Sequence, residues 1–113
     1  MFELTILTPT YNRKNELMKL RQCLLNQSSM DFQWLVIDDG STDGTEELFE
    51  YSDDCIQIDY IKKTNGGKAS AINYAHQFIQ SDIVAIVDSD DQLEENAVEI
   101  IIKNWNKHKA DPN

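Results

Sequence analysis

The chain has 113 residues, of which 41% are hydrophobic and 27% are charged, so it is long enough for one compact core and has a globular rather than a disordered composition. Its formal net charge of -10 would repel a phosphate backbone, which argues against nucleic acid as a partner. A small phosphorylated ligand would need a divalent cation to offset the local carboxylates. We therefore expect a single domain over residues 1–113.

The longest purely apolar run, residues 83–87, is far shorter than the roughly 18 residues that a membrane-spanning helix needs. Residues 1–3 have neither the basic start nor the apolar stretch of a secretory signal. These observations predict no membrane span in this chain and favour the cytoplasm. Cys23 and Cys55 lack metal-ligand spacing and are too few for a disulfide framework, so we interpret both as reduced structural thiols.

Four short segments in chain order predict β-strands. Residues 4–8, 34–38 and 83–87 are nearly continuous apolar runs, which is typical of parallel strands covered on both faces. Residues 56–60 instead alternate apolar with polar side chains, which favours a more exposed edge strand.

A stretch with helical spacing of apolar residues follows each of these strands. Asp43 with Glu46, and Asp91 with Glu94, have the spacing of an N-cap residue and an acidic N3 residue, which predicts that helices start there. The four apolar stripes are Leu17, Leu20, Leu24 and Leu25; Leu48 and Phe49; Ala69, Ile72, Ala75, Phe78 and Ile79; and Ala97, Ile100, Ile101 and Trp105.

Four consecutive strand-helix units predict a Rossmann-like α/β fold, with a mainly parallel sheet and helices on both faces. Ligands of such open sheets bind beyond the carboxyl ends of the strands, near the switch in strand order. In this sequence the residues with unusual chemistry directly follow the strands.

Residues 8–13, Thr-Pro-Thr-Tyr-Asn-Arg, follow the first strand and place an aromatic ring beside several hydrogen-bonding groups. A flat base can stack on Tyr11 in such a strand-to-helix turn. The alternative is an ordinary turn in which Asn12 caps the next helix.

Residues 38–45, Asp-Asp-Gly-Ser-Thr-Asp-Gly-Thr, follow the second strand. Strand alternation sends Asp38 and Asp39 in opposite directions, so one carboxylate can face the ligand crevice while the other supports the loop. A carboxylate is a good acceptor for the ring N–H of uracil, thymine or guanine. A plain capped turn is the alternative.

Residues 65–68, Asn-Gly-Gly-Lys, lead into a helix and combine a flexible turn, free backbone N–H groups and a cation. Helix N-termini attract anions, but such a turn is weak evidence by itself. Its spacing matches neither a Walker loop nor the GxGxxG fingerprint, so the turn gives no support to a nucleotide triphosphatase or a dinucleotide-binding domain.

Residues 88–91, Asp-Ser-Asp-Asp, follow the last predicted strand and are the most informative stretch. Three carboxylates so close together repel one another, and a hard divalent cation resolves that conflict. Their oxygen ligands suit magnesium or manganese. The alternative is an acidic helix start in which Asp91 is the N-cap.

These four motifs, in this order, resemble those of the inverting family 2 glycosyltransferases of the GT-A fold. That family shares a P-x-Y-N turn, a D-D-G-S-x-D-x-T loop, an N-x-G turn and a D-x-D-D metal motif, which correspond here to residues 9–12, 38–45, 65–67 and 88–91. The resemblance covers essentially the whole chain. It implies an enzyme that transfers a sugar from a nucleotide-diphosphate donor to an acceptor hydroxyl, often in bacterial polysaccharide synthesis.

The resemblance also assigns roles to individual residues. Asp39 would accept a hydrogen bond from the base, Lys68 would approach the base or the phosphates, and Asp91 would share or replace the metal-binding role of Asp90. The cofactor would be Mn²⁺ or Mg²⁺, the favoured donor a UDP-sugar, and the acceptor a saccharide or a lipid-linked molecule. The implied nucleotide-binding residues are Pro9, Thr10, Tyr11, Asn12, Asp39, Lys68 and Asp88, and the implied metal ligands are Asp88 and Asp90.

The family's catalytic domain continues with an acceptor-binding part and a carboxylate base, and no segment here matches that part. We therefore expect the general base beyond Asn113, and interpret this chain as the N-terminal, donor-binding part of a longer domain that is inactive by itself. We assign Glu94, Glu95, Glu99 and the two histidines to solvated surfaces. A phosphoacceptor domain is disfavoured because its acidic pair follows the first strand. A nucleotide-diphosphate-binding module without catalysis is the main alternative.

Overall fold

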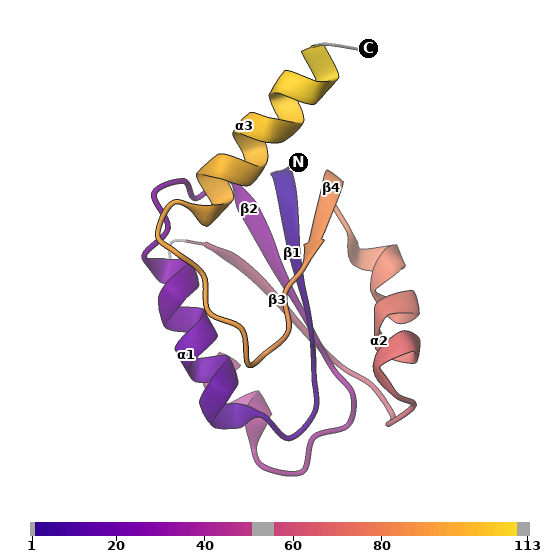
Figure 1. Cartoon of the computed structure of the whole chain (residues 1–113). Helices are drawn as coiled ribbons and strands as arrows, with labels where there is room; N and C mark the ends of the chain where they lie inside the picture. Colours follow the sequence, from indigo (N-terminus) through magenta and orange to yellow (C-terminus); the bar gives the residue numbers. More distant parts are fainter. Residues whose placement is uncertain (1, 51–55, 111–113) are drawn as a thin grey trace.

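A parallel four-stranded sheet with helices on both faces forms the protein in the computed structural model, which describes residues 2–50 and 56–110 (Figure 1). The predicted α/β architecture is therefore confirmed. The described elements are β1 (Phe2–Thr10), α1 (Lys14–Leu25), β2 (Phe32–Asp38), the 3₁₀ helix η1 (Thr45–Phe49), β3 (Gln57–Lys62), α2 (Lys68–Ala75), the 3₁₀ helix η2 (His76–Phe78), β4 (Ser81–Ile86) and α3 (Ala97–Ala110).

The strand order is β3-β2-β1-β4, and every neighbouring pair is parallel. The order reverses between β1 and β4, so this is the switch point at which ligands of open α/β sheets bind. β2 is buried along its whole length, whereas β3 lies at an edge and is only partly buried. The prediction of an exposed edge strand at residues 56–60 is confirmed.

The larger part of the core lies between the sheet and α1. Leu17, Leu20 and Leu24 recur at helical spacing and are fully buried against the sheet, as the sequence pattern predicts. Trp34 on β2 is the largest fully buried side chain. Its ring meets Phe49 edge-on at 5.8 Å between centroids, and its Nε1 donates a hydrogen bond to Thr8 Oγ1 at 3.0 Å.

The opposite face of the sheet is covered by α2. Ala71 and Ala75 are fully buried against Leu7, Leu35 and Ile37. The predicted stripe is confirmed for Ile72, Ala75, Phe78 and Ile79, which pack here, whereas Ala69 is exposed and Ala71 faces the sheet instead. α2 packs over β1 and β2. Its N-terminus lies at the carboxyl ends of these strands (Figure 1).

The prediction that residues 83–87 form a strand covered on both faces is wrong. β4 is an edge strand in which Ile83 and Ala85 pack into the core with α1, whereas Val84 and Ile86 are 40% and 52% exposed. The reason is the position of β4 at the edge. Val84 and Ile86 point to the same face of the sheet as α2, but α2 packs mainly over β1 and β2. An apolar run alone does not distinguish a central strand from an edge strand.

Of the two helix starts predicted from capping patterns, the one at Asp43 is off by one residue, and the one at Asp91 is wrong. Gly44 holds the N-cap position of η1, which has no side-chain cap, and Asp43 instead accepts a hydrogen bond from the backbone N–H of Lys14 at the start of α1. The last helix begins at Ala97, well after Asp91. No helix within the described ranges is both long and apolar enough to cross a bilayer.

Candidate functional site

A cavity of about 360 Å³ lies at the carboxyl ends of β1 and β4, within the size range of small-molecule sites. It is therefore at the switch in strand order, where the sequence predicts the ligand. It joins segments that follow three different strands and the start of α2. The lining residues are Pro9, Thr10, Tyr11, Arg13, Asp39, Lys68, Ala71, Asp88, Ser89 and Asp90.

Pro9 lies in a central strand, where a residue without an N–H normally breaks the sheet. Leu7 O accepts a hydrogen bond from Val87 N at 2.9 Å, and Thr10 O accepts one from Asp39 N at 2.8 Å. Because successive residues of a strand address alternate neighbours, Pro9 faces the β4 side, just beyond the end of that strand. Its missing donor is therefore tolerated, and this side of β1 opens into the cavity.

One wall of the cavity is formed by Thr10, the last residue of β1, and by Tyr11 directly after it. Thr10 is 4% exposed, and its Oγ1 is buried without a hydrogen-bond partner in the described structure. A buried hydroxyl without a partner is costly, so a polar ligand in the cavity would relieve that cost. The ring of Tyr11 is 47% exposed and is free to stack on a flat ligand.

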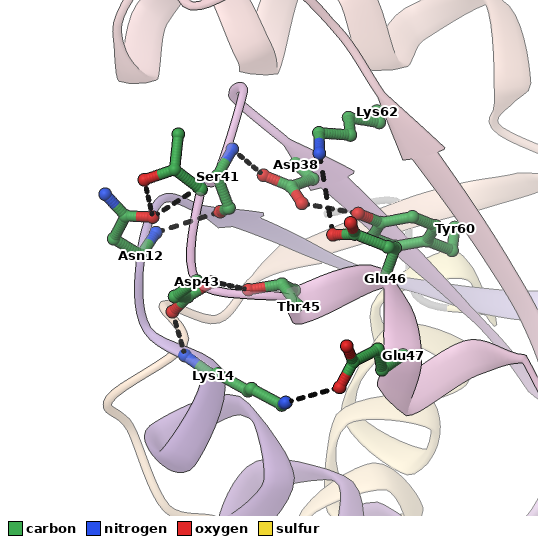
Figure 2. A network of polar contacts seen from close by, with 11 residues as sticks. Asn12, Lys14, Asp38, Ser41, Asp43, Thr45, Glu46, Glu47, Tyr60 and Lys62 are labelled. Atoms are coloured by element: carbon green, nitrogen blue, oxygen red, sulfur yellow. Dashed lines mark hydrogen bonds and ion pairs between the residues drawn. The ribbon is translucent and has the colours of Figure 1, made fainter.

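Asn12 lies outside the cavity lining and instead holds the loop that follows β2 (Figure 2). Its backbone N–H donates to Ser41 Oγ at 2.9 Å, and its Oδ1 accepts from Thr42 N at 2.7 Å. Its φ of 51° is left-handed, a conformation that asparagine tolerates better than most residues. The predicted nucleotide-binding role of Asn12 therefore has no direct geometric support.

Asp38 supports the loop, while Asp39 faces the cavity, so the predicted division between the two carboxylates is confirmed. Asp38 is fully buried, and its carboxylate accepts hydrogen bonds from the backbone N–H of Ser41 and from the Tyr60 hydroxyl (Figure 2). Two causes raise the pKa of Tyr60 far above its usual value: burial has the larger effect, and the hydrogen bond to Asp38 has the next largest. Tyr60 therefore remains a neutral donor that orients Asp38.

Asp39 accepts hydrogen bonds from four donors. Oδ1 binds Lys63 Nζ at 3.0 Å and Gly66 N at 2.9 Å, and Oδ2 binds Gly67 N at 2.8 Å and Asn65 Nδ2 at 3.3 Å. Burial alone would raise the pKa of Asp39, but the bonds from Lys63, Gly66 and Gly67 together hold it below the usual value. Asp39, which follows β2, is thus an ionised acceptor bound to the turn that precedes α2.

The glycine turn before α2 does not offer all of the free N–H groups that the sequence pattern predicts. The N–H groups of Gly66 and Gly67 point at the Asp39 carboxylate, so an internal anion already occupies this part of the helix N-terminus. Gly67 has a φ of 95°, which favours glycine over any residue with a Cβ. Lys68, the first residue of α2, is the cation of this turn that lines the cavity.

Carboxylate oxygens of Asp88, Asp90 and Asp91 lie within 4.8 Å of one another after β4. Asp88 Oδ1 pairs with Lys68 Nζ at 2.8 Å, and Asp91 Oδ2 accepts from the backbone N–H of Asp88 at 3.0 Å. The hydrogen bond and charge of Asp88 raise the pKa of Lys68. Lys68 therefore remains charged beside the acidic cluster.

This acidic cluster fits a hard divalent cation. It offers three carboxylate groups on one short turn, of which Asp88 and Asp90 also line the cavity. Magnesium-type sites commonly combine one or two protein carboxylates with phosphate oxygens of the ligand and water. The open position of Asp90, which is exposed, is compatible with such a shared site.

Three residues at the site were not singled out from the sequence. Arg13 and Ser89 line the cavity, and their positions directly beside the two motifs at residues 9–12 and 88–91 could have indicated them. Lys63 contacts Asp39 across 24 positions of sequence, so no local spacing signals it.

The acids and histidines assigned to the surface lie there. Glu94, Glu95, His76 and His108 are exposed and Glu99 is half-buried. Cys23 is free, whereas Cys55 lies outside the described residues.

The family model for glycosyl transferase family 2 matches residues 5–112, nearly the whole chain. The chain belongs to this family. The glycosyltransferase GlyA of Streptococcus pneumoniae serotype 4 is 33% identical over 110 residues, which cover 96% of this chain and 16% of GlyA. The family resemblance drawn from the four motifs is therefore confirmed.

Two solved structures share this fold. The crystal structure of S. aureus TarS 1-349 in complex with UDP-GlcNAc matches with a TM-score of 0.87 and 26% identity, over 96% of this chain and 32% of the TarS 1-349 chain. The mannosyltransferase PcManGT from Pyrobaculum calidifontis, in complex with GDP-Man and Mn²⁺, matches with a TM-score of 0.71 and 28% identity, over 80% of this chain and 28% of PcManGT. The chain thus spans a third or less of the length of GlyA and of these two matched chains.

Proposed function

We propose that this chain binds the nucleoside diphosphate of a sugar donor, as the donor-binding part of a metal-dependent, inverting glycosyltransferase. The observation that carries this proposal is the cavity at the β1/β4 switch, which brings an exposed aromatic ring, an ionised carboxylate and an acidic cluster to one place. The aromatic ring suits the face of the base, and the carboxylate suits the ring N–H at its edge. The acidic cluster suits the diphosphate through a divalent cation.

The base and ribose would occupy the side of the cavity formed by β1. Tyr11 would stack on the base, and the unpaired Oγ1 of Thr10 would gain a hydrogen-bond partner beside Pro9. Asp39 would accept the ring N–H of the base. Because a carboxylate has about four acceptor directions and Asp39 already has four donors, the base would replace the longest of these bonds, from Asn65 Nδ2 at 3.3 Å.

The diphosphate would lie near the acidic cluster. Asp88 and Asp90 would hold a Mn²⁺ or Mg²⁺ ion, with Asp91 sharing that role, and Lys68 and Arg13, which also line the cavity, would meet the phosphate oxygens. A bound divalent cation would neutralise the charge of the departing nucleoside diphosphate. The acceptor hydroxyl of a saccharide or lipid-linked acceptor would attack the anomeric carbon with inversion.

A UDP-sugar is the favoured donor. TarS, the more similar of the two structures by TM-score, was solved with UDP-GlcNAc, and PcManGT with GDP-Man. Uracil and guanine both present a ring N–H to an acceptor, so either base is compatible with the ionised Asp39. The competing proposal, a binding module without catalysis, shares this donor site and differs only in turnover.

Nucleotide binding should require a divalent cation, since the ligand and the acidic cluster are both anionic. Calorimetric titration of UDP should give strong binding in millimolar manganese and a large loss of affinity in chelator. Asp90→Asn should lose most of the manganese-dependent part, whereas Asp82→Asn removes a charge from an exposed position on β4 and should bind like the parent. Equal affinity in chelator and manganese would rule out the metal bridge.

Replacing Asp39 should weaken base recognition without removing the metal requirement. A hydrogen bond to a charged group is worth about 1.5–3 kcal/mol, which corresponds to a loss of about ten- to a hundredfold in affinity. Asp39→Ala should therefore bind UDP that much more weakly, yet still respond to manganese. Thermal unfolding of the variant is measured alongside, because Asp39 also anchors Gly66 and Gly67. Parent-like affinity would mean that another residue recognises the base.

A further inference from the structure

Lys63 makes a shielded ion pair with the carboxylate proposed to recognise the base. It directly follows β3, and its backbone N–H donates to Asp38 O at 2.8 Å, which extends the β2–β3 pairing by one residue. Its Nζ lies 3.0 Å from Asp39 Oδ1, and the two side chains are only 13% and 6% exposed. The ammonium group also donates to Thr64 O, so its position is fixed by two acceptors.

The neighbouring Lys62 shows what an ordinary surface contact looks like at the same place in the chain. Its Nζ lies 3.5 Å from Glu46 Oε2, and these side chains are 42% and 47% exposed. Exposed pairs of this kind contribute little, because water and salt screen them. Lys63 differs because its partner is buried and lines the cavity.

The donors around Asp39 divide its two oxygens into different roles. Oδ1 is held by Lys63 and Gly66 at 3.0 Å and 2.9 Å. Oδ2 has one firm bond, from Gly67, and one long bond from Asn65, whose Nδ2 also donates to Asp39 O at 3.0 Å. Asn65 can therefore leave Oδ2 without losing all its partners, which makes Oδ2 the oxygen available to a ligand.

Resting on the proposed function, we propose that Lys63 is a positioning residue that determines base selectivity: it holds Oδ1 of Asp39, so that ionised Oδ2 faces the base. An ionised carboxylate only accepts hydrogen bonds. It therefore matches N3–H of uracil, whereas N3 of cytosine is itself an acceptor. Without the Lys63 cation, Asp39 can rotate or protonate, and a protonated carboxyl group can donate to cytosine.

The test compares UDP with CDP on the parent chain and on Lys63→Met, Lys63→Arg and Lys62→Met, by calorimetry in manganese. Lys62→Met is the matched control, because it removes a charge at the adjacent position. Lys63→Met should lower UDP affinity about tenfold or more, as expected for a lost charged contact, and should lower the UDP-to-CDP affinity ratio. Lys63→Arg keeps the charge and its donors and should retain most of that ratio.

The outcomes separate this inference from the proposed function. If the parent chain binds neither nucleotide, the proposed function is wrong and the inference is wrong with it. If the parent binds UDP but Lys63→Met and Lys62→Met have the same affinity ratio, the role of Lys63 in selectivity is wrong while the donor site stands. A loss that is equal for UDP and CDP also overturns it, because a purely structural role predicts that pattern. If circular dichroism shows Lys63→Met to be unfolded, Lys63→Gln is judged by the same ratio.

Discussion

The 113-residue chain should bind a UDP-sugar in manganese and yet transfer no measurable sugar to an acceptor. The three carboxylates that line the cavity, Asp39, Asp88 and Asp90, all have proposed roles on the donor side. A positioned general base typically contributes about 10² to 10⁴ in rate, and orientation of the acceptor supplies roughly 7–11 kcal/mol of the barrier. Donor binding alone provides neither contribution.

The assay uses radiolabelled UDP-GlcNAc with a panel of saccharide and lipid-linked acceptors, and calorimetry on the same preparation establishes donor binding. If the gene encodes further residues, the longer product is assayed beside this chain and should restore transfer. Comparable transfer by the chain alone would mean that one of the described acids acts as the base. Glu94, Glu95 and Glu99, which we assign to the surface, would then be substituted one at a time.

Replacing Trp34 by alanine should destabilise the domain by about 3–5 kcal/mol, the usual cost of truncating a buried aromatic side chain. Trp34 is fully buried, packs edge-on against Phe49 and donates to Thr8 Oγ1. Because small domains have only about 5–15 kcal/mol of stability, most of it would be lost. Urea unfolding followed by circular dichroism measures the change.

Two further variants identify what the lost stability consists of. Trp34→Phe retains much of the apolar volume but removes the N–H bonded to Thr8, so its cost should be clearly smaller than that of Trp34→Ala. Trp105→Ala removes the same side chain from α3, where the residue is only half-buried, and should also cost less. Equal destabilisation by Trp34→Ala and Trp105→Ala would contradict the placement of the core between α1 and the sheet.

The location of the site could be predicted because it follows from order along the chain. Apolar runs alternating with helical patterns predict a parallel sheet, and parallel strands bring their carboxyl ends to one edge. The turn at 9–11 and the acids at 88–90 are far apart in sequence, yet both line the cavity. The four motifs were also sufficient to identify the family.

Short polar side chains in the loops make contacts that the local pattern does not specify. The capping pattern at Asp43 predicts a helix start, but Asp43 binds the backbone of Lys14, at the beginning of a different helix. Asn12, whose nucleotide contact stays a prediction, holds the loop at Ser41 and Thr42. Local patterns of asparagine and aspartate indicate hydrogen-bonding capacity without specifying the partner.

The sequence by itself determined the fold class, the family and the end of the sheet at which the cavity forms, since these depend on periodicity and on residues adjacent to strand ends. Only the tertiary structure decided that β4 is an edge strand and that Lys63 and the Gly66–Gly67 turn converge on Asp39. The physical reason is that lateral neighbours and hydrogen-bond partners are set by how distant segments pack, and the 24 positions between Lys63 and Asp39 carry no local signal of their contact.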